Sequence, residues 1–161
     1  PIYEALLEQD GIHLTSRPSA QALEQLKLNG LPVVGANRAR VRETGRAADL
    51  LRAALPAGHH VYPVVNAADR VIGLITSEDL AILEADPTLS LLVTASDIMR
   101  PAASVSIDDT LLTALDLMRA ERLPELPVLD AAGRVLGFVD ETAIASAYLQ
   151  QTHPSSGPQN A

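Results

Sequence analysis

The sequence contains no cysteine or tryptophan, and it has few aromatic and few basic residues. Without cysteine, the chain forms neither disulfides nor thiolate metal sites. Aromatic residues make up 2% of the 161 residues, so the core must be aliphatic, and stacking of nucleic-acid bases is not expected. The 12 Lys and Arg residues are outnumbered by 20 Asp and Glu residues, which argues against binding to the phosphates of a nucleic acid.

Long apolar runs are also missing. The longest runs, such as Val71 to Ile75, have about five residues, whereas a membrane-spanning helix needs roughly 20. No basic segment followed by an apolar stretch marks a signal peptide at the start. The chain begins at Pro1 and not at Met, which is consistent with a piece cut from a longer protein.

An internal repeat is the most informative feature that the sequence does contain. Residues 63–75 (PVVNAADRVIGLI) align without a gap with residues 127–139 (PVLDAAGRVLGFV), at an offset of 64 residues. Each copy predicts a strand, a tight turn and a returning strand that is covered on both faces. The turn needs a residue that tolerates a positive φ, which is Asp69 in the first copy and Gly133 in the second.

A helix is predicted before and after each hairpin. An apolar stripe at three- and four-residue spacing predicts a helix over residues 110–120, with Ser106 and Asp109 forming a capping box before it. The corresponding helix of the first copy is expected over residues 45–55, because Pro56 cannot continue it. The helices that close the two units are predicted over residues 78–84 and 142–150.

The order strand, helix, strand, strand, helix therefore occurs twice, which predicts an α/β fold of the α+β type. We divide the chain into a lead-in, two repeats and a flexible tail, at residues 1–30, 31–90, 91–150 and 151–161.

The repeated helix, the segment LPVLD and the segment GRVLG resemble a tandem pair of CBS domains, also called a Bateman module. Residues 97–101 (DIMRP) look like the lead-in that is typical of this family. In the first repeat, residues 33–35 (VVG) stand where the family usually has Asp, a hydrophobic residue and Met. The resemblance implies two repeats that pack through their sheets about a pseudo-two-fold axis.

A narrower resemblance concerns residues 1–12 (PIYEALLEQDGI), which look like the linker after the last membrane helix of bacterial ClC-family chloride channels and transporters. This resemblance implies a cytosolic regulatory domain at the cytoplasmic face of the cell membrane. It also implies a homodimer, and a membrane-embedded chloride-transport domain in the same polypeptide.

The segment from Gly73 to Asp79 (GLITSED) resembles the adenosine-binding motif of CBS domains. In that motif the Asp79 carboxylate would accept hydrogen bonds from the ribose hydroxyls, and Thr76 with the helix N-terminus would meet ribose or phosphate. Val61 and Tyr62 match positions that line the adenine pocket. The resemblance therefore implies ATP, ADP or AMP as a regulatory ligand, and it requires no cofactor.

The same residues also have a purely structural interpretation. Thr76 and Asp79 satisfy the reciprocal cap that any helix start favours. In the second copy, Asp140 replaces the threonine and Ala143 replaces the aspartate. A carboxylate repels phosphate and alanine cannot hold a ribose, so no second nucleotide site is expected.

No motif for catalysis is present: we find no nucleophile with an adjacent base and no Gly-rich phosphate loop with lysine. His59 and His60 are neighbours before a strand, where side chains alternate between faces, so we expect a pocket edge and not a shared metal. We therefore expect a protein that is not an enzyme. Two alternatives stay open, a nucleotide-sensing domain of another transporter or enzyme and a ligand-free dimerisation module.

Overall fold

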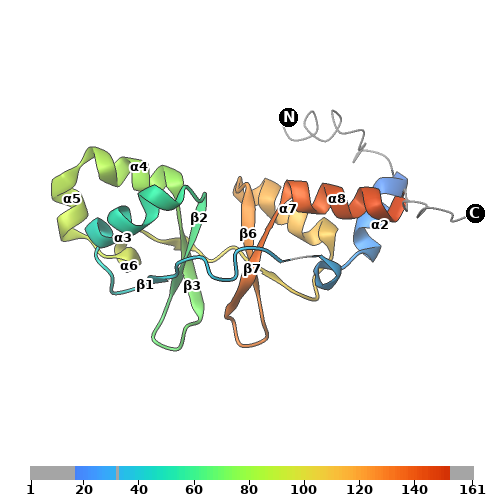
Figure 1. Ribbon diagram of the computed structural model, residues 1–161, viewed down its shortest axis with the longest axis horizontal. Helices are drawn as coiled ribbons and strands as arrows, with labels where there is room; N and C mark the ends of the chain where they lie inside the picture. The colour runs from blue at the N-terminus through green and yellow to red at the C-terminus, as the bar shows by residue number, and fades with distance from the viewer. Residues whose placement is uncertain (1–16, 32, 153–161) are drawn as a thin grey trace, which may run out of the picture.

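The computed structural model describes residues 17–31 and 33–152 of the chain. Figure 1 shows two halves side by side, each with a β-hairpin near the centre of the molecule and helices on its outer side. The two hairpins meet through β2 (Val61–Val65) and β6 (Glu125–Leu129). This mixed α/β architecture confirms the predicted fold class.

The first half follows the predicted order of elements, with one helix before the hairpin and one after it. Its other elements are β1 (Val41–Arg42), α3 (Ala47–Ala54), the 3-10 turn η2 (Leu55–Ala57), β3 (Val71–Thr76) and α4 (Ser77–Ala85). Helix α3 ends just before the turn that contains Pro56, because proline cannot continue a helix. Two short helices that the sequence did not predict, α5 (Pro87–Leu92) and α6 (Ala95–Ile98), lead toward the second half.

The second half repeats this order, but the predicted capping box of its first helix is wrong. Its other elements are β5 (Val105–Ser106), α7 (Leu111–Glu121), β7 (Val135–Asp140) and α8 (Glu141–Thr152). Thr110 is the N-cap of α7, and its hydroxyl accepts the N–H of Thr113 at 3.1 Å. Ser106 still belongs to β5, and its N–H donates to the Asp109 carboxylate at 2.8 Å in the turn that precedes the helix.

The segment at the start of each repeat pairs with the sheet of the other repeat. The strand β4 (Arg100–Pro101), near the start of the second repeat, joins β3 as the edge of the first sheet. In the opposite direction, Val34 forms a bridge to Phe138 on β7. Both contacts need a glycine, which is Gly73 on β3 and Gly137 on β7. A Cβ on Gly73 would lie 2.6 Å from the Met99 sulfur, and a Cβ on Gly137 would lie 2.8 Å from the Val34 oxygen.

The hairpin turns have the backbone conformation that the sequence predicts. Asp69 has a φ of 63° and Gly133 has a φ of 79°. The two turns also contact each other, because the N–H of Val71 donates to the Gly133 carbonyl at 2.9 Å. The halves are therefore joined at the turns as well as between their sheets.

The core is aliphatic, as the composition requires, and it forms two clusters. The first cluster lies within the first half, and the second cluster lies in the second half and also includes Val61 and Leu74 of the first sheet. Leu23 on α2 (Arg17–Gln25) and Leu28 on the 3-10 turn η1 (Leu28–Gly30) are buried in the second cluster against α7. Part of the expected lead-in thus completes the core of the second half. No helix within the described ranges is long and apolar enough to cross a membrane.

The linker-like residues 1–12 lie outside the described residues, as do residues 153–161 of the expected tail.

Candidate functional site

The start of helix α4 brings Thr76 and Asp79 together in a reciprocal cap. The Thr76 hydroxyl accepts the N–H of Asp79 at 3.3 Å, while the Asp79 carboxylate accepts the N–H and the hydroxyl of Thr76 at 3.0 Å each. The capping arrangement that the sequence predicts is confirmed. It leaves the second carboxylate oxygen of Asp79, Oδ1, for a further partner.

That partner is Arg100, which lies on β4 near the start of the second repeat. Its Nη2 donates to Oδ1 of Asp79 at 2.7 Å and its Nε donates to Oδ2 at 2.9 Å. Burial raises the pKa of Asp79, but the hydrogen bonds from Arg100 and Thr76 outweigh burial and hold that pKa below its usual value. The Arg100 side chain is 48% exposed, so this ion pair can exchange with solvent or with a ligand.

A cavity of about 100 Å³ lies beside this ion pair, and both repeats contribute to it. The first repeat supplies His60, Thr76, Ser77 and Glu78, whereas Arg100, Arg122, Leu123 and Pro124 come from the second half and its lead-in. The N-terminus of α4 faces a site with two arginines, an arrangement that suits an anion.

Sequence reasoning missed both arginines. The segment DIMRP contains Arg100, but only the pairing of β4 with β3 directs Arg100 toward Asp79. Arg122 is the C-cap of α7, where its φ of 55° lies in the left-handed region, and no local pattern marked it as part of the site.

Val61 and Tyr62, the residues expected beside the base, are buried in β2. Val61 pairs with Thr76 across the β2–β3 ladder, but its side chain belongs to the second hydrophobic cluster. The Tyr62 side chain lies in the first cluster, and its hydroxyl donates to the Ala54 carbonyl at 2.9 Å. Neither side chain lines the cavity at Asp79.

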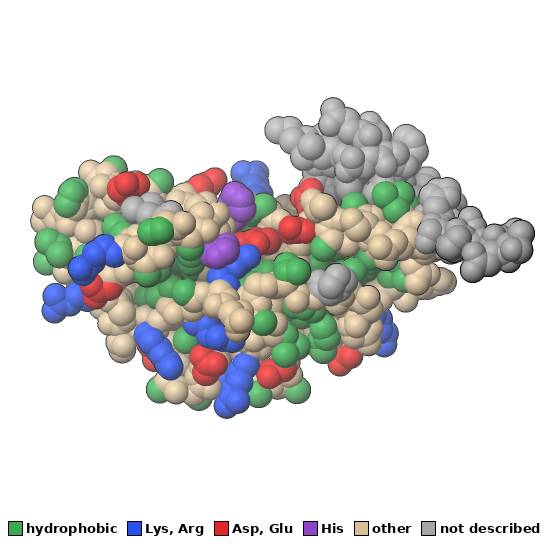
Figure 2. Space-filling view, viewed as in Figure 1, with side chains coloured by type: hydrophobic (Ala, Val, Ile, Leu, Met, Phe, Trp, Pro, Cys, Tyr) green, Lys and Arg blue, Asp and Glu red, His purple; other side chains and the backbone are tan. Residues whose placement is uncertain are grey.

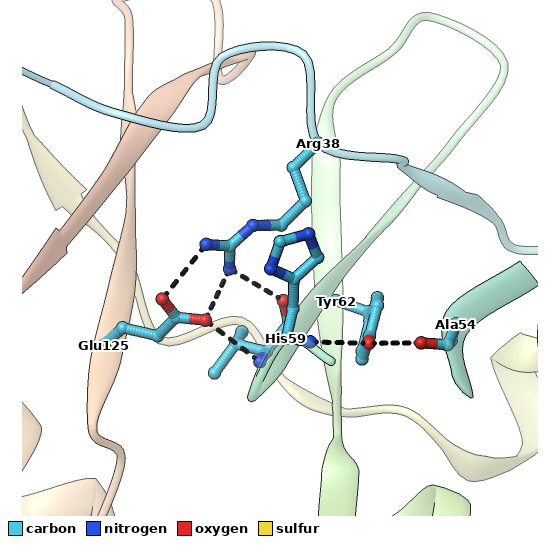
Figure 3. A network of polar contacts seen from close by, with 6 residues as sticks. Arg38, Ala54, His59, Tyr62 and Glu125 are labelled. Carbon is cyan, nitrogen blue, oxygen red and sulfur yellow. Dashed lines mark hydrogen bonds and ion pairs between the residues drawn. The ribbon is translucent and has the colours of Figure 1, made fainter. Parts of the chain in front are cut away.

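The main-chain groups of Val61 are bound by a buried ion pair that joins the two halves (Figure 3). Glu125 accepts the N–H of Val61 at 3.2 Å, and Arg38 donates to the Val61 carbonyl at 3.3 Å. Arg38 also binds both carboxylate oxygens of Glu125, and its guanidinium stacks 3.7 Å from the ring centroid of Phe138. The Nε atom of Arg38 is buried and has no hydrogen-bond partner among the described residues.

His59 lies next to this ion pair and packs edge-on against Tyr62, with ring centroids 6.1 Å apart. Burial lowers the pKa of His59, and the nearby charge of Arg38 lowers it further. His60 instead lines the cavity beside the Asp79–Arg100 ion pair, so the two neighbouring histidines lie in different environments. Within residues 17–31 and 33–152, no three His, Asp or Glu residues lie together as a metal site would require.

The second copy uses its substituted residues differently. Asp140 accepts the N–H of Ala143 at 2.8 Å and thereby caps helix α8. Ala143 provides no carboxylate at the position that Asp79 occupies in the first copy. Burial, together with the charge of Asp140, raises the pKa of the neighbouring Glu141. Among the described residues no arginine lies within ion-pair distance of Asp140 or Glu141, unlike Asp79, so their negative charge is not balanced there and is unfavourable for a phosphate group.

Comparison with known proteins assigns this architecture to a known domain family. A family model described as the CBS domain matches residues 41–85 and again residues 95–150. A search of curated proteins finds no match.

Several solved structures share the fold. CBSX2 from Arabidopsis thaliana, a CBS-pair protein that has been solved in complex with AMP, has 21% sequence identity and a TM-score of 0.64, over 79% of this chain and 98% of that one. The CBS domain of a bacterial CNNM/CorC family Mg²⁺ transporter in complex with ATP has 18% identity and a TM-score of 0.65, over 80% and 91%. The CBS domain of a membrane protein from Sphaerobacter thermophilus has 21% identity and a TM-score of 0.56, over 88% and 96%.

Proposed function

The chain belongs to the CBS domain family as a tandem pair of regulatory domains, and we propose that it senses an adenine nucleotide at the start of helix α4. One observation carries this proposal: Thr76 and Asp79 lie at a helix N-terminus beside two arginines from the other half. Hydroxyl, carboxylate and guanidinium groups are the partners that ribose and phosphate require. The solved complexes of CBS domains with AMP and with ATP support the choice of ligand.

Binding requires Arg100 to change partners. The cavity of about 100 Å³ is smaller than the roughly 300 Å³ of the smallest typical ligand pockets. Release of Arg100 from Asp79 enlarges this space and frees the carboxylate to accept the ribose hydroxyls. Arg100, Arg122 and the N-terminus of α4 then bind the phosphate. Because both halves contribute residues, the nucleotide favours the conformation in which these residues come together, and it shifts the population toward that state.

Calorimetric titration of the chain with AMP, ADP and ATP tests this proposal. We expect binding by the unmodified chain and at least about a tenfold loss of affinity in Asp79→Ala, because charged hydrogen bonds contribute about 1.5–3 kcal/mol each.

Asp97→Ala is the matched control, since Asp97 forms the same capping box with Thr94 at the start of α6, whereas Arg100 of the cavity pairs with Asp79. Equal affinity in the chain and in Asp79→Ala, or no heat at millimolar nucleotide, contradicts the proposal.

A ligand-free dimerisation module is the second candidate function. It is favoured by the finding that the Asp79 carboxylate is fully occupied by Thr76 and Arg100. The same titration separates the two candidates, because a scaffold gives no heat with any nucleotide.

For the parent protein, we propose a ClC-type chloride channel or transporter whose CBS pair lies at the cytoplasmic face of the membrane. The resemblance of residues 1–12 to the ClC linker supports this origin. A CNNM/CorC-type transporter or an enzyme is the alternative, and CBS domains of the former share the fold. The gene sequence upstream of Pro1 decides: a series of hydrophobic helices matching ClC supports the proposal, whereas a catalytic domain contradicts it.

We also propose a homodimer, which exposed apolar side chains on α4 and α5 support. These are Ile82, Leu91 and Leu92, with exposed fractions of 65%, 61% and 75%. Helices α4 and α5 contact each other, and a contiguous apolar patch on a protein surface marks an interaction site. Light scattering should give twice the mass of the monomer for the unmodified chain and the mass of one chain for Leu91→Glu/Leu92→Glu. The mass of one chain for both contradicts the homodimer.

A further inference from the structure

A second cavity, of about 290 Å³, lies in the first half between β1 and α3. It shares no lining residue with the cavity at Asp79. Its volume is close to the lower end of the roughly 300–1,000 Å³ range of small-molecule sites, so it has room for a compact organic ligand. We call it the α3 cavity.

The floor of the α3 cavity is apolar and has no free polar group. Leu50, Ala54 and Tyr62 form this floor, and each is less than 8% exposed. The Tyr62 hydroxyl is already bonded twice, since it donates to the Ala54 carbonyl and accepts the N–H of His59 at 3.1 Å (Figure 3). A ligand in this floor gains from burying apolar surface, whereas a polar base edge would lose its hydrogen bonds to water.

The rim of the α3 cavity is basic, although the chain as a whole is acidic. Of the chain's 12 Lys and Arg residues, five lie within residues 38–52, together with only two acidic residues. Three of these arginines line the cavity: Arg40, Arg42 and Arg46. Figure 2 shows basic side chains gathered over the first half and the two hairpin turns.

Acidic neighbours balance only part of this charge. Asp49 also lines the cavity, but its carboxylate pairs with Arg52. Arg40 lies 3.9 Å from the Asp69 carboxylate. In the part of the chain that the structure describes, Arg42 and Arg46 have no acidic partner within ion-pair distance.

Arg42 is also held in place at the rim. It donates to the carbonyl of Asn66 at 2.9 Å, and this bond uses one of the five N–H donors of its guanidinium. The remaining donors of Arg42 and the exposed Arg46 are available to an anionic group at the rim.

From the apolar floor and the basic rim, we propose that the α3 cavity binds an amphipathic organic anion, with an apolar body on Leu50, Ala54 and Tyr62 and a carboxylate or phosphate head at Arg42 and Arg46. This ligand is separate from the nucleotide at Asp79, and the proposal does not depend on that function.

Calorimetric titration with octanoate and with the neutral octanol tests the proposal on the full chain. We expect octanoate to bind at millimolar concentration or below, and octanol to bind at least about tenfold more weakly because it lacks the charged head. Arg46→Gln should weaken octanoate and leave octanol unchanged. Arg119→Gln, at an exposed position on α7 that does not line the cavity, is the matched control and should change neither.

A blocking variant locates the binding. Ala53 lines the cavity from an exposed position on α3, so Ala53→Phe fills the space without disturbing the core, and it should abolish octanoate binding. The proposal is overturned if octanoate does not bind, if octanol binds equally well, or if Ala53→Phe binds like the unmodified chain. Displacement of octanoate by AMP in Asp79→Ala also overturns it, because the cavity would then take a nucleotide.

Discussion

Glu125→Ala should be among the most damaging substitutions in this chain. The Glu125 carboxylate is bonded to two nitrogens of Arg38 and to the N–H of Val61. Without it, the Arg38 guanidinium, whose side chain is 8% exposed, stays buried over Phe138 without a counter-charge. Removing one partner of a buried pair costs about 3–5 kcal/mol, a fifth or more of the roughly 5–15 kcal/mol by which domains are stable.

The double variant Arg38→Met/Glu125→Val should recover most of this loss, because an apolar pair of similar volume often replaces a buried ion pair at no cost. Valine is also the residue at the corresponding position of the first repeat, Val61. Urea denaturation followed by circular dichroism gives the free energy of unfolding for each variant. Asp49→Ala removes an exposed pair with Arg52 and should cost at most about 1 kcal/mol.

Two results would refute this reasoning. One is a loss below about 1 kcal/mol in Glu125→Ala, which would mean that water reaches Arg38 and screens its charge. The other is a double variant as unstable as the single one, which would mean that packing and not an uncompensated charge causes the loss.

Three further predictions concern the contact between the halves and the ionisable groups. Gly137→Ala should destabilise the fold by about 1–3 kcal/mol in urea denaturation, because the new Cβ meets the Val34 oxygen at 2.8 Å. Gly30→Ala is the control, because a Cβ at Gly30 meets nothing within 4 Å. Equal losses in the two variants would contradict the close pairing of the Val34 segment with β7. The pKa of Asp79 is lower in the folded chain, so the contribution of its carboxylate to stability is present above the usual value of about 3.9 and is lost as the pH falls through the folded pKa. The difference in unfolding free energy between the unmodified chain and Asp79→Asn should shrink over that range. A constant difference would contradict the pKa shift. The pKa of His59 should lie below the usual value of about 6.5 in a proton–carbon NMR titration. Stability should fall as the pH drops through about 6.5, because the unfolded chain binds the proton more readily. A His59 pKa at or above the usual value would contradict its burial.

Local chemistry explains which parts of the fold could be predicted. The two hairpins follow from short-range patterns, and even the positive φ of Asp69 was predictable because its neighbours match those of Gly133. The reciprocal cap joins Thr76 and Asp79, which are three positions apart, and it was equally predictable. In each case the residues that determine the structure are neighbours along the chain.

The rest of the site depends on contacts between distant segments. Arg100 meets Asp79 only because β4 crosses to the sheet of the first half. Arg38 and Glu125 are 87 residues apart, and no sequence pattern pairs them. One signal was present: Glu125 is a charged residue in a strand whose other members are apolar, at the position that valine occupies in the first repeat. A buried charge of this kind implies a partner without identifying it.

The crossing of the lead-in segments makes the two repeats depend on each other. If the chain were cut between its halves, β3 would lose its neighbour β4, and β7 would lose its bridge to Val34. Strands with unpaired edges invite pairing with other chains. A single repeat would therefore satisfy its sheet only by borrowing the lead-in of a second copy, as in a domain-swapped dimer. The duplicated chain carries out within one molecule the exchange that such a dimer would need two molecules to make.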